Sequence, residues 1–287
     1  MALPLGRQPH EAATAQLELE KIELGLLLEA VYRQYGYDFR EYALASLRRR
    51  VWRRVQEERL ASITALTDRL LHDPACMARL LTDLSISVTA MFRDPHFYVS
   101  FAEHVVPQLR TYPFTRIWVA GCSTGEEVYS LAILLAENDL YDRTRIYATD
   151  INQLALDQAR HGVYPLDRMQ EYTENYLRAG GRRSFSEYYV AAYDGALFDA
   201  ALSENVIWAQ HNLAQEGSFN EFQVILCRNV LIYFDKALQD RVQRLFYESL
   251  GRFGTLCLGN KESMRFSAYE DSYELVDAAA KIYRRVT

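Results

Sequence analysis

The spacing of apolar residues predicts that the chain begins with helices. Between residues 14 and 86, apolar side chains recur three or four positions apart, as Leu47, Val51 and Val55 do, which is the period of an amphipathic helix. Two shorter helices are expected on either side of Asp73-Pro74, where proline interrupts the pattern. This part is therefore predicted to be a small helical bundle.

From residue 113 onward, short apolar runs alternate with helical patterns. A strand over 116–120 and a helix over 126–137 come first, joined by a turn rich in glycine, serine and threonine. The elements expected after them are strands over 145–149, 206–209, 224–227, 255–259 and 281–285 and helices over 153–161 and 237–250. Such alternation is typical of βαβ units, so the second part is predicted to be an α/β fold with a parallel sheet.

One segment, residues 164–205, does not fit this alternation. It contains Gly180-Gly181 and then alternating polar and apolar positions before Asp194-Gly195. These features predict a small antiparallel β-subdomain inserted into the α/β fold. We therefore expect a helical domain with its linker over residues 14–95 and an α/β domain over residues 96–287.

The charge of the chain is acidic overall and basic in one place. Lys and Arg number 32 against 38 Asp and Glu, a net charge of −6, which argues against a general affinity for nucleic acid. Residues 40–59, however, carry seven arginines against three glutamates. This basic segment is either a docking surface or an ordinary solvated helix face.

Cysteine usage and hydropathy predict the compartment. Cys76, Cys122, Cys227 and Cys257 form no CxxC or Cys/His cluster, so neither a disulfide framework nor a metal site is expected. No run approaches the ~18 consecutive apolar residues of a membrane span. The first residues also lack the apolar run of a secretory signal. We therefore expect a cytoplasmic protein that does not insert into a membrane.

The strongest candidate site is the turn over Val119–Glu127. Gly121 and Gly125 permit a tight turn and close approach of a ligand to the backbone, and the helix that follows presents unpaired N–H groups. Asp150 ends the second predicted strand, where an acidic residue can accept hydrogen bonds from ribose hydroxyls. The alternatives are a purely structural turn and a helix cap at Asp150 or Asn152.

The acidic pair Glu126-Glu127 distinguishes two adenosine-containing ligands. The diphosphate of a nicotinamide dinucleotide would be repelled by carboxylates at the mouth of the turn, whereas the cationic methionine end of S-adenosylmethionine would be attracted. An interaction with the helix dipole also accounts for the pair. The pattern therefore favours a methyltransferase that uses S-adenosylmethionine over a dehydrogenase.

Four blocks occur in order along the chain: Ser87–Pro95, Ala120–Ser130, Ala148–Ile151 and Cys227–Asp235. From about Tyr35 to the C-terminus, the sequence resembles the bacterial chemoreceptor glutamate methyltransferases, the CheR family. The resemblance implies a helical N-terminal domain, a Rossmann-like methyltransferase domain and a β-subdomain near residues 164–205. The chain departs from the family at Val128 and in Gly259–Glu262, a loose version of Gly-His-Ser-Glu. Neither departure removes a residue expected to contact the cofactor.

The resemblance also implies roles for individual residues. The cofactor-binding residues it implies are Ser87, Thr89 and Arg93 for the methionine portion, Gly121, Glu127 and Asp150 for the turn, the amino acid end and the ribose, Asn212 and Leu213 for the adenine, and Arg228 and Asn229 for the far side of the pocket. Arg93 and Tyr233 are the candidate catalytic residues, because they can hold the incoming carboxylate. Each of these side chains also has a structural interpretation as a cap, a turn or an ion pair.

The reaction implied is methyl transfer from S-adenosylmethionine to glutamate side chains of chemoreceptors, with S-adenosylhomocysteine as the product. A free glutamate has a pKa of about 4.3, so the nucleophile is ionised at neutral pH and needs no general base. Positioning then carries most of the catalysis and is worth roughly 7–11 kcal/mol. The candidate docking residues for an acidic receptor helix are Arg49, Arg50, Arg53 and Arg54.

Two alternatives to this function remain at the level of sequence. One is a methyltransferase acting on another acidic substrate. The other is a non-catalytic adaptor that binds S-adenosylhomocysteine within a chemosensory array. The presence of both Arg93 and Asp150 favours the enzyme.

Overall fold

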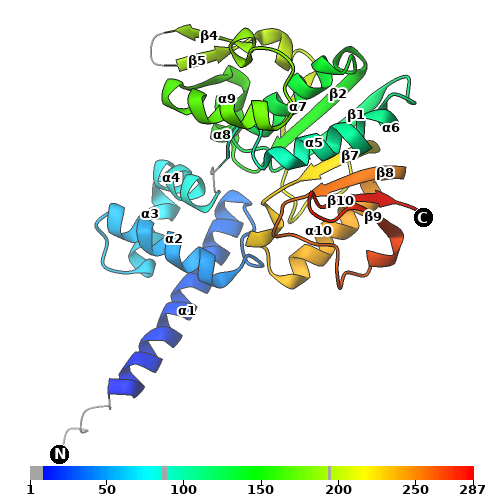
Figure 1. Ribbon diagram of the computed structural model, residues 1–287. Helices are drawn as coiled ribbons and strands as arrows, with labels where there is room; N and C mark the ends of the chain where they lie inside the picture. Colours follow the sequence, from blue (N-terminus) through cyan, green and yellow to red (C-terminus); the bar gives the residue numbers. More distant parts are fainter. Residues whose placement is uncertain (1–8, 86–88, 193–194) are drawn as a thin grey trace, which may run out of the picture. The chain divides into compact units, whose positions relative to one another are not determined.

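The computed structural model describes residues 9–85, 89–192 and 195–287. The chain forms two compact units, which divide between Leu84 and Ser85. Within the described residues, the first unit is helical, whereas the second contains a large and a small sheet (Figure 1). Of the described helices, none has the combination of length and apolar character that a membrane crossing requires.

The helices of the first unit are α1 (Pro9–Tyr35), α2 (Leu44–Glu57), α3 (Ile63–His72) and α4 (Pro74–Leu84). The predicted stripe of Leu47, Val51 and Val55 on α2 is at most 1% exposed, so it faces the core of this unit. Ser62 caps α3 by accepting a hydrogen bond from a backbone N–H, and the break at Asp73-Pro74 separates α3 from α4. The predicted helical bundle is confirmed.

The second unit is built on a seven-stranded sheet with the order β6-β2-β1-β7-β8-β10-β9. Its strands are β1 (Thr115–Ala120), β2 (Thr144–Asp150), β6 (Val206–Gln210), β7 (Phe222–Cys227), β8 (Leu250–Leu258), β9 (Tyr273–Asp277) and β10 (Ile282–Arg285). The pairs from β6 through β8 are parallel, as predicted, whereas β10 pairs antiparallel with both β8 and β9. The sheet is therefore mixed rather than wholly parallel.

The helices of the second unit are α5 (Pro95–His104), α6 (Val106–Leu109), α7 (Glu126–Glu137), α8 (Gln153–His161), α9 (Met169–Arg178) and α10 (Lys236–Ser249). Alternate residues of β1 are buried on opposite faces of the sheet. Trp118 packs edge-on against Phe246 of α10, whereas Ile117 and Val119 join the core that includes Leu131 of α7. β1 lies between β2 and β7, and the chain crosses from one side of β1 to the other between β6 and β7, which creates a switch point at the ends of these strands.

The predicted antiparallel insertion is confirmed. A small sheet with the order β3-β5-β4 is formed by β3 (Val163–Pro165), β5 (Gly195–Phe198) and β4 (Tyr189–Ala192). Both of its pairings are antiparallel. The expected turn at Asp194 lies outside the described residues, and α9, within the same segment, was not predicted. The α/β class, with a helical N-terminal part and a small β-insertion, is the fold of this chain.

Candidate cofactor and active site

Four parallel strands end at the same edge of the sheet, and each is followed by candidate residues. The Gly121–Gly125 turn follows β1, Asp150 ends β2, Asn212 comes after β6, and Arg228 follows β7 directly. These strands are neighbours in the order β6-β2-β1-β7. Because the carboxyl ends of parallel strands lie at one edge, the fold gathers side chains that are far apart in the sequence.

The turn after β1 has a left-handed backbone at three of its residues. The φ angles are 77° at Gly121, 51° at Ser123 and 93° at Gly125. A Cβ added at Gly121 would lie 2.5 Å from a methyl group of Val230, in the loop that follows β7. Glycine is therefore required at this position both by its conformation and by the close approach of the two loops.

Asp150 lies beside this turn and is 8% exposed. One carboxylate oxygen accepts the backbone N–H of Ser123 at 2.9 Å, and the other accepts that of Asn152 at 2.9 Å. Burial raises the pKa of Asp150 above the ordinary 3.8, although these N–H groups oppose the shift. Asn152, and not Asp150, caps α8, because its side chain accepts the N–H of Leu154. Each oxygen of Asp150 retains capacity to accept a ligand hydroxyl.

Arg228 is the centre of a buried ion cluster. Its guanidinium donates to Glu127 Oε1 at 2.6 Å and to Asp94 Oδ2 at 2.9 Å. The same group lies 4.0 Å from the centroid of the Phe97 ring. Burial alone would lower the pKa of Arg228, but the charges of Glu127 and Asp94 are among the effects that outweigh it and raise it. Arg228 is thus a permanent cation that fixes Glu127 at the start of α7.

The two members of the acidic pair have different surroundings. Glu126 is buried and accepts a hydrogen bond from the Thr124 hydroxyl at 2.6 Å. Burial raises the pKa of Glu126 above the ordinary 4.5. Glu127, in contrast, keeps some solvent exposure while it is paired with Arg228. The attraction of a cationic ligand that the sequence suggested for both glutamates therefore applies to Glu127 alone.

Glu262 is a residue of this edge that the sequence argument did not assign to the site. Its buried carboxylate accepts backbone N–H groups from Gly259 at 2.6 Å, Val230 at 2.8 Å and Asn229 at 3.0 Å. Asn229 itself has a left-handed φ of 62°. Glu262 thus holds the loop after β7 in place. An acidic residue just beyond the predicted strand over 255–259 was the signal that could have identified it.

The segment before α5 contributes the remaining candidates. The carbonyl oxygen of Arg93 accepts a hydrogen bond from Arg228 at 3.2 Å, and that of Thr89 accepts one from Arg168 at 3.3 Å. Ser87 lies outside the described residues. Tyr233 is half-buried at the end of a short 3₁₀ helix, η5 (Leu231–Tyr233). The structure therefore ties the backbone of Arg93 to the Arg228 cluster.

Asn212 holds the turn that follows β6. Its side-chain oxygen accepts the N–H of Ala214 at 3.0 Å, and its amide donates to Gln215 at 2.8 Å. Leu213, the other candidate for the adenine, is buried. These bonds match the structural interpretation of Asn212. A contact of Asn212 or Leu213 with adenine stays a prediction.

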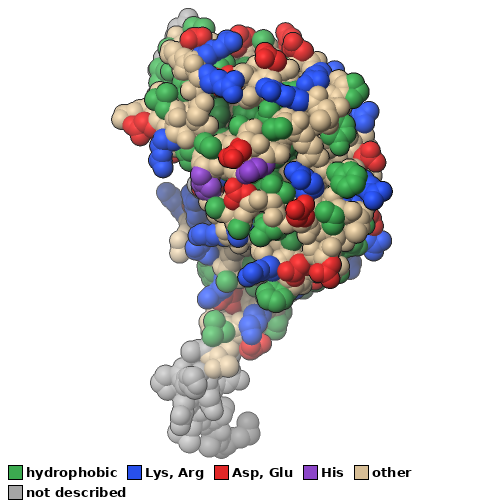
Figure 2. Space-filling view, turned by 45° about the vertical axis from the view of Figure 1, so that its right-hand side comes forward, with side chains coloured by type: hydrophobic (Ala, Val, Ile, Leu, Met, Phe, Trp, Pro, Cys, Tyr) green, Lys and Arg blue, Asp and Glu red, His purple; other side chains and the backbone are tan. Residues whose placement is uncertain are grey.

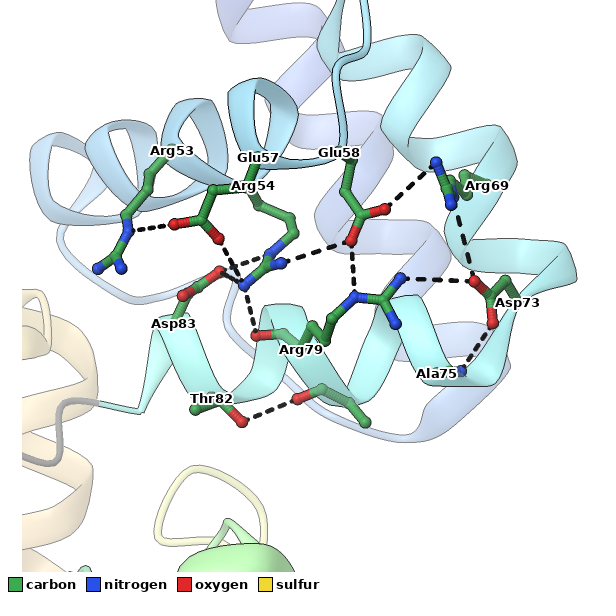
Figure 3. A network of polar contacts seen from close by, with 11 residues as sticks. Arg53, Arg54, Glu57, Glu58, Arg69, Asp73, Ala75, Arg79, Thr82 and Asp83 are labelled. Carbon is green, nitrogen blue, oxygen red and sulfur yellow. Dashed lines mark hydrogen bonds and ion pairs between the residues drawn. The ribbon is translucent and has the colours of Figure 1, made fainter.

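The four candidate docking arginines of α2 fall into two groups that differ in exposure. Arg49 and Arg53 are exposed. Arg50 and Arg54 are each only 8% exposed. Arg50 donates to the carbonyl oxygen of Leu84, and Arg54 belongs to an ion network with acidic residues of the same unit (Figure 3). Arg50 and Arg54 are therefore buried within the helical unit, where each side chain connects α2 to a residue of α4.

Comparison with known proteins identifies the family. The model described as CheR methyltransferase, SAM binding domain, matches residues 87–282, and the CheR all-alpha domain matches residues 22–85. A protein of Pseudomonas putida named Cher3 is 52% identical over 264 residues, which cover 92% of this chain and 97% of that protein. The chain belongs to the CheR methyltransferase family.

Other members of the family are more distant. Chemotaxis protein methyltransferase 2 of Pseudomonas aeruginosa is 32% identical over 82% of this chain and 84% of its own length. The chemotaxis protein methyltransferase of Escherichia coli is 32% identical over 68% of this chain and 66% of its own. The resemblance noted in the sequence is confirmed.

As a CheR methyltransferase, the chain uses S-adenosylmethionine as its cofactor, and the residues at the sheet edge fit this molecule chemically. Asp150 offers a buried carboxylate to ribose hydroxyls. Glu127 can accept an ammonium group while it remains bound to Arg228, since a carboxylate accepts several hydrogen bonds.

We expect that Asp150→Ala weakens the binding of S-adenosylhomocysteine at least tenfold. The variant removes the only acidic side chain at the end of β2 and leaves ligand hydroxyls without a buried acceptor, a loss of about 1–3 kcal/mol. Isothermal titration calorimetry measures the affinity, and circular dichroism verifies folding. Asp157→Ala, which removes a half-exposed carboxylate of α8, is the matched control and should bind normally.

The pH dependence gives a second check on Asp150. Ribose hydroxyls bind best to the ionised carboxylate, so binding must displace a proton wherever Asp150 is protonated in the free protein. Burial raises the pKa of Asp150 above 3.8, so the affinity of the wild-type chain should rise as the pH increases through that raised pKa. The Asp150→Ala chain should lack this rise. An unchanged affinity in the variant would contradict the ribose assignment.

Proposed function

We propose that this chain transfers the methyl group of S-adenosylmethionine to glutamate side chains of chemoreceptors in the cytoplasm. The γ-carboxylate oxygen of the substrate forms the new bond to the methyl carbon, and the electron pair of the carbon–sulfur bond leaves with sulfur. The products are a γ-methyl ester and S-adenosylhomocysteine. The observation that carries the proposal is the Arg228–Glu127–Asp94 cluster, which joins the segment before α5 to the cofactor turn.

The chemistry of the site supports a carboxylate nucleophile that comes from the substrate. Glutamate is ionised at neutral pH, so the chain has no need to remove a proton. Cys122 and Cys227 lie at this edge of the sheet, but burial raises the pKa of each thiol well above the ordinary 9.0. They stay protonated and do not compete for the methyl group.

Positioning is the task left to the chain. Arg228 fixes the carbonyl group of Arg93 and, through Glu127, the first turn of α7. This contact supports a role of Arg93 near the start of α7, where its guanidinium would hold the carboxylate of the substrate. Tyr233 would supply a second hydrogen bond from the loop after β7. A well-aligned pair of reactants gains roughly 7–11 kcal/mol in this way.

We expect that Arg93→Ala lowers turnover more than it lowers cofactor affinity. Its proposed role is to align the substrate carboxylate, an interaction that matters most in the transition state. The experiment compares kcat with the calorimetric Kd for S-adenosylmethionine, and Arg93→Lys tests whether a single positive charge is sufficient. Equal losses in the two quantities would show that Arg93 is only a cofactor ligand.

The direct test of the function is methyl transfer to a receptor. The chain is incubated with S-adenosylmethionine labelled in its methyl group and with cytoplasmic fragments of chemoreceptors. A base-labile label that disappears when the receptor glutamates are changed to glutamine is the expected result. Binding of S-adenosylhomocysteine without any transfer would instead favour the adaptor, and labelling of a different acidic protein would favour the other substrate class.

The exposed arginines of α2 support an acidic partner. A positive surface facing an acidic receptor helix raises the association rate, and salt screens this effect. We expect that Arg49→Glu with Arg53→Glu raises the KM for the receptor and flattens its salt dependence, while the Kd for S-adenosylmethionine is unchanged. Methylation rates measured across a salt series provide the check. Wild-type rates at every salt concentration would make this an ordinary solvated face.

A further inference from the structure

A groove of about 400 Å³ lies beside the loop that follows β7. Its walls come from η5, from the beginning of α10 and from residues 261–266, all within the second unit. A volume of this size accommodates several side chains of a peptide. The methyl-transfer chemistry described above does not use it.

The groove shares a structural element with the cofactor site. The side chain of Val230 packs against Gly121 in the cofactor turn, and the next two residues, Leu231 and Ile232, line the groove. The buried carboxylate of Glu262 accepts the N–H groups of both Val230 and Ile232, at 2.8 Å and 3.4 Å. The loop after β7 therefore connects the groove to the cofactor turn.

The charged groups of the groove favour an acidic occupant. Lys261 and Arg265 are exposed, and Lys236 keeps more than half of its side chain in solvent while paired with Asp240. Glu262 also lines the groove, but its carboxylate is occupied by backbone N–H groups. On the face shown in Figure 2, side chains of both signs are interspersed. An acidic segment would therefore be attracted by a local group of cations, such as the lysines and the arginine that line the groove.

An exposed aromatic ring stands at the groove. Phe266 is 87% exposed and has a left-handed φ of 61°, a conformation that is unfavourable for a bulky residue. Its backbone is held there from both sides, since its N–H donates to Glu270 and its carbonyl oxygen accepts from Lys236. A strained residue that presents an apolar ring to solvent suits contact with a partner.

We propose that this groove binds an acidic stretch of the polypeptide substrate, adjacent to the glutamate that is methylated. Lys261 and Arg265 contact its carboxylates, and Phe266 packs against an apolar side chain of the same stretch. The inference rests on the proposed function, because it takes the substrate to be a polypeptide glutamate. It adds a determinant of substrate choice within the methyltransferase domain itself.

The test is a binding experiment with two fluorescently labelled peptides of about 20 residues. One carries a central glutamate flanked by leucines and glutamates at helical spacing, and in the other the flanking glutamates are glutamines. Fluorescence anisotropy measures Kd in the presence of S-adenosylhomocysteine. The wild-type chain should bind the acidic peptide at least tenfold more tightly. Lys261→Glu with Arg265→Glu should remove this preference, and Phe266→Ala should weaken both peptides severalfold.

A matched control reverses the same number of charges elsewhere on the second unit. Arg244→Glu with Arg252→Glu changes exposed cations that do not line the groove, and it should retain the preference within twofold. Lys261→Ala with Arg265→Ala is a milder pair that keeps the test valid if the charge reversal perturbs folding. Equal binding of both peptides by the wild-type chain, or equal losses in the groove and control variants, overturns the proposal.

Methyl transfer to the same peptides separates this inference from the proposed function. A chain that prefers the acidic peptide through Lys261 and Arg265, but methylates no peptide or receptor glutamate, supports the groove and contradicts the methyltransferase proposal. A chain that methylates receptor fragments normally in the Lys261→Glu, Arg265→Glu background, with an unchanged KM, contradicts the groove alone.

Discussion

Replacement of Arg228 by glutamine should destabilise the second unit by about 3–5 kcal/mol and abolish cofactor binding. The guanidinium is buried between Asp94 and Glu127 and donates to both. Without it, the carboxylates of Asp94 and Glu127 would lose the cation that they share, and removing one member of a buried ion cluster costs roughly this amount. The start of α7, which carries Glu127, would also lose its anchor.

Denaturant unfolding and calorimetric titration with S-adenosylhomocysteine measure the two effects. Arg228→Lys keeps the positive charge but lacks the planar guanidinium, whose fixed N–H groups reach both carboxylates. It should therefore be more stable than Arg228→Gln but less stable than the wild-type chain. Arg244→Gln is the matched control, because the pair between Arg244 and Glu248 is exposed and should contribute little to the stability. Normal stability and affinity in Arg228→Gln would contradict the role assigned to the cluster.

The period of the apolar residues was sufficient to predict the main elements of the fold. It located α8 at its observed bounds and the parallel strands within a few residues, because buried strands and amphipathic helices leave strong local patterns. The glycine turn and Asp150 were found for a similar reason: βα turns that bind nucleotides impose local constraints on sequence. An edge strand such as β9, which has charged residues at Glu274 and Asp277, has no such pattern and was missed.

The contacts within the site could not be predicted in the same way. Asp94 and Arg228 are 134 positions apart, and no local spacing relates them. Glu262 was identified only as part of a departure from the family pattern, since its role depends on backbone N–H groups more than 25 positions away. Burial of Arg50 was also hidden, because arginine on a helix is usually solvated and its burial here follows from its bond to Leu84.

Arg54→Glu should destabilise the helical unit by more than about 3 kcal/mol. The Arg54 guanidinium pairs with Asp83 at 2.6 Å, with Glu57 at 3.0 Å and with Glu58 at 3.4 Å (Figure 3). The substitution would replace the shared cation by a further carboxylate in a largely buried position. Arg79 pairs with the same Oε1 oxygen of Glu58, but its other ion pair is with Asp73, so it does not replace the contacts of Arg54 with Asp83 and Glu57.

The neighbouring residue provides the control for this prediction. The Arg53 side chain is 68% exposed and pairs with Glu57, so Arg53→Glu should change the stability far less than Arg54→Glu does. Hydrogen exchange of the full chain can locate the effect, because faster exchange in Arg54→Glu should be concentrated in α2 and α4, which the network joins. Substrate KM should respond in the opposite order, since Arg53 faces solvent and Arg54 does not. If Arg54→Glu left exchange rates unchanged and raised only the KM for the receptor, Arg54 would be a docking residue after all.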